Sequence, residues 1–471
     1  MQRKWWALVT VALATFMTYL DNNVVNVALP TIQRDLELTI SGLEWIVSSY
    51  ILVFAGLLLV GGRLADVFGT RTIFFAGLGV FTLASVAAGL AGSQEMLIAA
   101  RALQGVGAAM LTPTTLAMLP AIFPDPRERA TAVGIWSAVG ALAMAVGPLT
   151  GGLLSENAHW GWIFLINAPI GAVTAVLGFL TIRVPRTERR RTGLDLPGLT
   201  FSAVALFALT YALIEGESRG WGSAPILGAF GVAAAGALAF VVTEYRTSRP
   251  MIDLSLFRER VFSGGLLSQG LWSFGVFGIY FFTALYLQSA LGFSPTEAGA
   301  AFVPMALLTA VVAATSPRIA GRFGAAPTVA TGLGLMAVAI AGLSSAGAGS
   351  GYLDLLPWFL LYGVGAGLLV PLTNVVLDVM PATRAGVASG VLNVSRQVFG
   401  LLGITILGAI MNNRQSSLTG APMHTFLEAY RFTLLIAAAI VLAGVPVSLY
   451  ALRTRRAAPA PVEAPIAEPV S

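Results

Sequence analysis

Long apolar runs separated by short polar stretches fill this chain from residue 5 to residue 452. Each run holds about 20 residues, which as an α-helix crosses a hydrocarbon layer about 30 Å thick. Lipid offers no hydrogen-bond partner, so each run must satisfy its own backbone, and these runs are too continuously apolar for barrel strands. The pattern predicts an all-α integral membrane protein with fourteen transmembrane helices. We place the spans at residues 5–29, 42–62, 72–91, 97–120, 130–154, 160–182, 196–215, 224–244, 262–290, 297–318, 326–347, 354–379, 385–411 and 430–452.

Parts of the sequence occur twice. GRLADVFGTR at 62–71 is repeated as PRIAGRFG at 317–324, and LQGVGAAMLTP at 103–113 as LYGVGAGLLVP at 361–371. The copies lie about 255 residues apart. A membrane protein of two similar halves with a site between them is the common plan of a secondary transporter.

The repeat offset also predicts the domains. Residues 1–183 and 261–456 form two pseudo-symmetric six-helix bundles, and residues 184–260 form an inserted two-helix hairpin. The tail 457–471 is rich in proline and alanine, so we expect it to be disordered and cytoplasmic.

Charge is scarce and its placement indicates topology. Only 10% of the residues are charged, against about 25% in a soluble domain. Basic residues gather in alternate loops, beginning with Arg3 and Lys4 and ending with Arg453, Arg455 and Arg456. Such loops stay in the cytoplasm. We therefore expect both termini inside the plasma membrane of a bacterium, and we expect no nucleic-acid partner although the net charge is +5.

Asp21 lies inside the first span, where an ionisable group is costly and therefore suggests function. Helical spacing places Thr18 near it and stacks Asn22 and Asn26 on the adjoining face, giving one polar wall that suits a water-filled cavity. A carboxylate there can hold either a proton or a positive charge. The structural alternative is an ion pair or a cap at the outer end of the helix.

Arg101 begins the fourth span in RALQGVGAAM, followed by Gln104. The first span runs outward and the fourth inward, so Arg101 and Asp21 both fall in the outer part of the membrane. We expect a pair whose strength depends on protonation of Asp21. The alternative is an arginine that reaches the lipid headgroups.

A further motif concerns the packing of helices. Gly140, Gly147, Pro148, Gly151 and Gly152 combine a glycine stripe with a helix-bending proline, which lets neighbouring helices touch. Tight packing alone is the alternative interpretation.

Gly62, Asp66, Gly69 and Arg71 belong to the loop GRLADVFGTR, which we expect to act as a cytoplasmic gate, with Gly69 permitting a tight turn. A solvated loop is the alternative.

Catalytic and cofactor chemistry is not predicted. The chain has no cysteine and only two histidines. It contains no GxxxxGK[ST], HExxH or GxSxG pattern. We expect no metal, no cofactor and no enzyme activity.

Gln269, Phe277 and Asn374, together with Gln104, complete the substrate cavity that we expect.

These motifs resemble the major facilitator superfamily. Residues 62–71 resemble its signature loop, Arg101 to Gly107 the fourth-helix motif assigned to proton coupling, and Gly147 to Gly152 the fifth-helix motif found in antiporters. LDNNVVNVALP at 20–30 resembles the first helix of fourteen-helix drug:proton antiporters of EmrB/QacA type. The chain departs from that pattern at Asn23, where threonine is usual, and at Gly161, where arginine is usual.

The resemblance implies alternating access, in which inward proton flow drives export. We expect a monomeric, proton-coupled multidrug exporter of hydrophobic compounds, with cationic ones favoured. The alternatives are export of an endogenous metabolite or self-made antibiotic, uptake by symport, and a membrane enzyme or channel. The GPLTGG pattern argues against symport.

Comparison of the copies suggests a division of labour between the halves. Asp21 corresponds to Phe277, Asp66 to Gly321 and Arg101 to Phe359. We expect the first half to carry coupling and gating, and the second half to supply an apolar, aromatic wall for the substrate.

Overall fold

The computed structural model describes residues 2–182, 195–247, 250, 254–347, 349–378 and 385–453. Those residues form helices and connecting turns, and fourteen segments are long and apolar enough to cross a membrane. The expected number of spans is therefore confirmed. The helices are α1 (Gln2–Asp35), α2 (Ile40–Phe68), α3 (Thr70–Gly89), α4 (Gln94–Ile122), α5 (Pro126–Asn157), α6 (Trp162–Leu165), α7 (Asn167–Thr181), α8 (Leu196–Arg219), α9 (Ala224–Arg246), the 3-10 helix η1 (Leu254–Arg258), α10 (Arg260–Ser289), α11 (Pro295–Ala301), α12 (Val303–Phe323), α13 (Ala325–Leu343), α14 (Tyr352–Gly367), α15 (Val370–Asp378), α16 (Ala385–Ser417) and α17 (Pro422–Ala451).

Three spans are interrupted, which the apolar pattern alone does not predict. The sixth consists of α6 and α7, the tenth of α11 and α12, and the twelfth of α14 and α15. Each break lies two or three residues before a proline, at Pro169, Pro304 and Pro371. A proline lacks the N–H that the preceding turn needs, and its ring clashes with the carbonyl four residues earlier.

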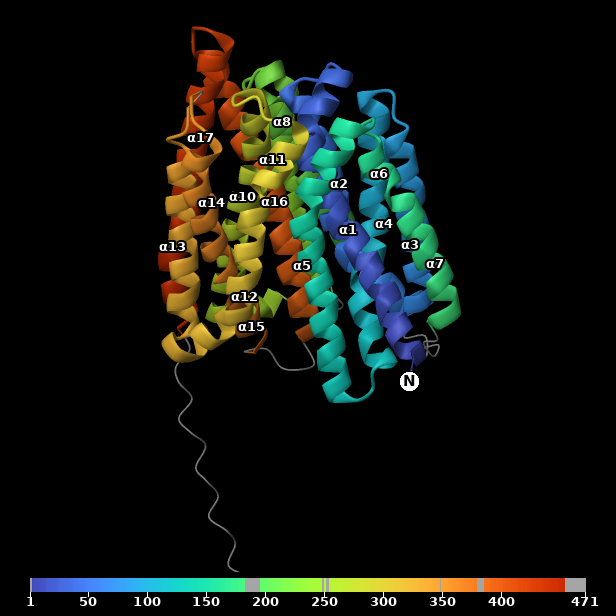
Figure 1. The fold of residues 1–471 in the computed structure, drawn as a ribbon. Helices are drawn as coiled ribbons and strands as arrows, with labels where there is room; N and C mark the ends of the chain where they lie inside the picture. Colours follow the sequence, from blue (N-terminus) through green and yellow to red (C-terminus); the bar gives the residue numbers. More distant parts are fainter. Residues whose placement is uncertain are drawn as a thin grey trace, which may run out of the picture.

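The helices pack in two groups (Figure 1). In the first, α4 packs against α2 and α3, and α1 packs against α5 and α7. In the second, α14 packs against α12 and α13, and α10 against α16 and α17. The groups meet where α5 contacts α11, α16 contacts α2, and α1 contacts α10.

The sequence repeat is also a repeat of backbone conformation. Gly69 ends α2 with φ +93°, and Gly324 ends α12 with φ +94°. Their N–H groups donate to the carbonyls of Ala65 and Ala320, at 2.9 Å and 2.8 Å. Side chains other than glycine rarely adopt this φ, so both loops need glycine to turn directly into the next helix.

Glycines that correspond in the two halves make corresponding helix contacts. A Cβ on Gly105 would meet the backbone of α2, and one on Gly363 the backbone of α12. A Cβ on Gly107 would meet α3, and one on Gly365 would meet α13. Close backbone approach through small residues is how membrane helices associate. The fold is thus pseudo-symmetric in its packing as well as in its sequence.

The hairpin of α8 and α9 contacts both groups. Its two helices pack on each other, and α8 also contacts α2 and α16. Trp45 of α2 donates its Nε1 to Glu215 of α8 at 3.0 Å. The division at residues 183, 184, 260 and 261 stays a prediction, and the expected tail 457–471 lies outside the described residues.

Candidate functional site

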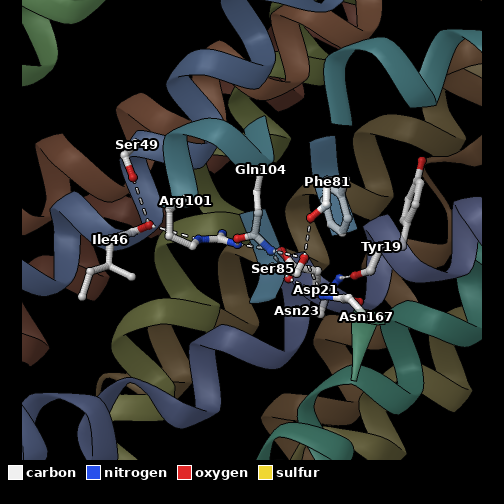
Figure 2. Close-up of polar contacts among 10 residues, drawn as sticks. All are labelled: Tyr19, Asp21, Asn23, Ile46, Ser49, Phe81, Ser85, Arg101, Gln104 and Asn167. Carbon is white, nitrogen blue, oxygen red and sulfur yellow. Dashed lines mark hydrogen bonds and ion pairs between the residues drawn. The ribbon is translucent and has the colours of Figure 1, made fainter. Parts of the chain in front are cut away.

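A fully buried ion pair joins α1 and α4. The Nη1 of Arg101 lies 2.6 Å from the Oδ2 of Asp21, and their side chains are 1% and 0% exposed (Figure 2). The two residues were expected to lie at the same depth and to form a pair, and the structure places them in direct contact. Because two unpaired charges could not remain at such a site, each charge stabilises the other there.

Three more polar side chains complete a cluster around Asp21. Gln104 of α4 and Asn167 of α7 each donate a hydrogen bond to Oδ1 of Asp21 at 2.9 Å. Gln104 also donates to the hydroxyl of Ser85 on α3 at 2.8 Å. Four helices of the first group thus meet at one carboxylate (Figure 2). Charge-assisted bonds of this kind are about twice as strong as neutral ones.

Arg101 is held on every side. Its Nη1 donates to Oε1 of Gln104 at 2.9 Å, and its Nε donates to the carbonyl of Ile46 at 3.3 Å. The guanidinium carbon lies 4.4 Å from the ring centroid of Tyr50 and 5.6 Å from that of Phe164. Cation–π contact with a desolvated guanidinium is favourable. Contacts other than the one with Asp21 therefore also hold the guanidinium of Arg101 in place.

A cavity of about 620 Å³ lies beside this cluster, and Tyr50 belongs to its wall. The volume suits a small organic molecule. Its lining comes from α1, α2, α4, α5, α10 and α16, together with Pro250. Asp21 and Arg101 are not part of the lining, and the ring of Tyr50, which is, lies against the guanidinium of Arg101.

The cavity extends toward the end of the bundle that carries the N-terminus. Gly62 and Arg63 near the end of α2, Leu116 and Ala117 near the end of α4, and Gly390 near the start of α16 all line it. Leu116 is 40% exposed although it faces the cavity. The lining of the cavity therefore extends to the ends of α2 and α4 on this side.

The opposite end is closed by helix contacts between the two groups. A Cβ on Gly152 of α5 would overlap the carbonyl of Pro295 on α11, and one on Gly299 would overlap the carbonyl of Pro148. Oε2 of Glu156 accepts a hydrogen bond from the backbone N–H of Thr296 at 2.9 Å. We call this α5–α11 contact the far-end seal.

The helix α5 connects the far-end seal to α1, the helix that carries Asp21. A Cβ on Gly147 would lie 2.7 Å from Cβ of Asn23 on α1, and one on Gly151 would overlap the carbonyl of Val24. The same motif thus packs α5 on α1 just after Asp21 and on α11 at the seal. Gly140 makes only an ordinary contact, with its Cβ position 3.8 Å from Thr15.

The other predicted site residues fall into two groups. Thr18, Asn22, Asn26 and Phe277 line the cavity. Gln104 belongs to the Asp21 cluster instead, because its side chain turns toward α1 and α3.

Gln269 and Asn374 are not among the lining residues either. Gln269 sits on the cavity-facing stripe of α10, one turn before Trp272, and Asn374 is exposed on α15. Among the gate-loop residues, Gly62 lines the cavity and exposed Arg71 lies over the ring of Phe75 at 5.6 Å. The side chain of Asp66 lies outside the described residues.

Several residues of the site were not predicted from the sequence. Asn167 and Ser85 bind in the cluster, and Tyr50, Trp136 and Trp272 line the cavity. Asn167 could have been found by the rule applied to Asp21, because it is a polar side chain inside an apolar span. The aromatic residues carry no such signal, because aromatics are common in any membrane helix.

A buried polar cluster in one of two packed helix groups, beside a cavity that lies between the groups and reaches one end, is the arrangement of a membrane transporter. The chain belongs to the Major Facilitator Superfamily, whose model matches residues 11–404.

Similar proteins carry related descriptions. The "Tetracenomycin C resistance and export protein" of Streptomyces glaucescens is 35% identical over 413 residues, covering 88% of this chain and 77% of that protein. The "Multidrug resistance protein Stp" of Mycobacterium tuberculosis (strain CDC 1551 / Oshkosh) is 37% identical over 407 residues, covering 86% and 75%. A solved bacterial homologue of the human lysosomal transporter Spinster, described as inward-facing and unoccupied, matches with a TM-score of 0.70 at 17% identity, over 96% of this chain and 98% of that one.

Removing Arg101 should destabilise the fold more than removing the pair. Arg101→Met leaves the Asp21 carboxylate buried without its cation, and we expect a loss of about 3–5 kcal/mol. In the double variant Asp21→Leu/Arg101→Met no unpaired charge remains, so part of that loss should be recovered. Thermal unfolding in detergent measures both. Equal or greater destabilisation of the double variant would show that the pair does not act as a unit.

Proposed function

We propose that this protein exports small, largely apolar antibiotics or drugs from a bacterial cytoplasm in exchange for protons, by alternating access. The observation that carries the proposal is the buried carboxylate of Asp21, paired with Arg101 directly behind the cavity wall. The descriptions of its relatives as resistance and export proteins support the direction and the type of cargo. Membrane-embedded carboxylates are typical sites of proton binding in transporters.

The sidedness of the proposal rests on the basic loops. If these lie in the cytoplasm, as the positive-inside rule predicts, both termini are cytoplasmic and the cavity reaches the cytoplasm. The state described here is then inward-facing, and the far-end seal closes the outer side. A cargo molecule enters the cavity from the cytoplasm or the inner part of the bilayer.

Proton binding acts on the ion pair. A protonated Asp21 no longer balances the charge of Arg101, so the free energy that joins α1 to α4 falls. Asn23 and Val24, which follow Asp21 on α1, pack on Gly147 and Gly151 of α5. The next glycine of α5 belongs to the far-end seal. Protonation therefore favours opening of the outer end, and the inward-facing state with its intact pair favours proton release.

Exchange follows from these opposite preferences. Protons bind more tightly to the outward-open state, and cargo binds more tightly to the inward-facing cavity. By linkage, each ligand then weakens the binding of the other without direct competition for one site. Protons taken up outside are released inside, and cargo moves in the opposite direction.

Replacement of Asp21 tests proton coupling. In proteoliposomes with an imposed pH gradient, we expect Asp21→Asn to reduce gradient-driven transport of a fluorescent drug at least tenfold, because no proton can be gained or lost there. Downhill exchange of the same drug should persist. Asp35→Asn is the matched control, since Asp35 is exposed at the end of the same helix. Undiminished gradient-driven transport by Asp21→Asn would refute the coupling role.

Cysteine labelling tests sidedness. The chain has no cysteine, so Leu116→Cys introduces a unique thiol in the cavity. We expect a membrane-impermeant maleimide to label it in inverted vesicles and not in right-side-out vesicles. Leu90→Cys, at the exposed turn between α3 and α4, should show the opposite pattern. Reversed patterns would place the cavity on the outer side.

A further inference from the structure

The charge of the cavity lining points to a class of cargo. The described lining residues include two arginines, Arg63 and Arg396, and no aspartate or glutamate. The lining offers aromatic faces, which attract cations, but no described carboxylate, and its two guanidinium groups would repel a cation. The lining thus favours a ligand that carries negative charge.

Asp21 does not offset this positive charge. Its Oδ2 accepts from Arg101, and its Oδ1 accepts from Gln104 and Asn167. The carboxylate is therefore occupied, lies outside the lining and is fully buried. An expectation of cationic cargo depends on Asp21 being open to the cavity.

Unpaired hydrogen-bond donors strengthen the case. Nε of Arg396 and the indole Nε1 atoms of Trp136 and Trp272 are buried without a hydrogen-bond partner among the described residues. All three residues line the cavity, on α16, α5 and α10. Buried N–H groups that lack an acceptor are costly, and a rotation of these side chains toward the cavity would bring them to a ligand oxygen, since the atoms have almost no accessible surface in this state. Gln397, which follows Arg396 in the sequence, is only 4% exposed, and its Oε1 has no hydrogen-bond donor among the described residues.

The rest of the lining suits an aromatic body. Phe54, Trp136, Trp272, Phe277 and Tyr280 contribute rings from three helices. Rings gain from offset or edge-to-face contact with an aromatic ligand in addition to the area that they bury. The polar and aromatic parts of the wall lie together on α10 and α16, so one amphiphilic molecule can contact both.

We infer that the cargo is an aromatic amphiphile bearing a carboxylate, sulfonate or phenolate, and that the guanidinium of Arg396 receives its anionic group. This inference rests on the proposed export function and names the substrate class of that cavity. Arginine suits the role because its planar fork pairs with two oxygens of one anion. Export of an anion also runs with an interior-negative membrane potential, in addition to the proton gradient.

Three fluorescent probes of similar size test the inference on full-length protein in nanodiscs, with empty nanodiscs as reference. They are anionic anilinonaphthalene sulfonate, uncharged phenylnaphthylamine and cationic ethidium. We expect the anion to bind at least tenfold more tightly than ethidium. Arg396→Gln should weaken the anion at least tenfold and change the uncharged probe less than twofold. Arg396→Lys, which keeps the charge, should retain part of the anion affinity.

Arg414→Gln is the matched control. Arg414 lies on the same helix outside the lining, over the ring of Phe432 at 5.3 Å, and its replacement should leave all three affinities unchanged. Ethidium binding as tightly as the anion, or unchanged anion binding in Arg396→Gln, would overturn the inference. In proteoliposomes that contain the same protein, Asp21-dependent, pH-driven transport of ethidium alone would overturn the inference and leave the proposed function intact. Loss of pH-driven transport for all three probes would instead count against the proposed function.

Discussion

The structure depends on one constraint, which is that a charge inside a membrane protein has to be balanced where it lies. Asp21 and Arg101 balance each other at 2.6 Å with almost no exposure. Gln104, Asn167 and the carbonyl of Ile46 form further hydrogen bonds with the two side chains. The arrangement of α1, α2, α4 and α7 around this point follows from that requirement. A proton added to Asp21 would remove this balance, and on the function proposed here the same interaction both holds the bundle together and switches it.

Symmetry in the backbone is combined with asymmetry in charge. Gly152 packs on α11, and its counterpart Gly408 packs on α2, so two equivalent contacts join the halves. At the first contact α11 presents Gly299, whereas at the second α2 presents the buried Glu44. The repeat of small residues thus gives the halves equivalent contacts, whereas the side chains at these contacts differ in charge.

The sequence predicts the fold well because each transmembrane helix and each tight turn is determined by residues that are close together in the chain. Apolar length sets each span, and Gly69 and Gly324 mark where one helix turns into the next. Asp21 and Arg101 could be paired because their depths follow from the spans alone. Asn167 could not be paired with Asp21, since 146 residues separate them and the contact depends on how α7 packs on α1. The cavity was only partly predicted, because its wall combines side chains from six helices and depends on which rotamers those side chains adopt.

The central claim is that protonation of Asp21 shifts the protein between its two openings. Spin labels on Leu90→Cys and Leu353→Cys, exposed at the far end of the two helix groups, report that opening as a distance distribution. The account predicts that acidification lengthens the distance in the otherwise unchanged protein. It also predicts that the added substitution Asp21→Asn gives the same distribution at every pH, weighted toward the longer distance. A pH-dependent shift of the same size in the presence of Asp21→Asn would contradict the account.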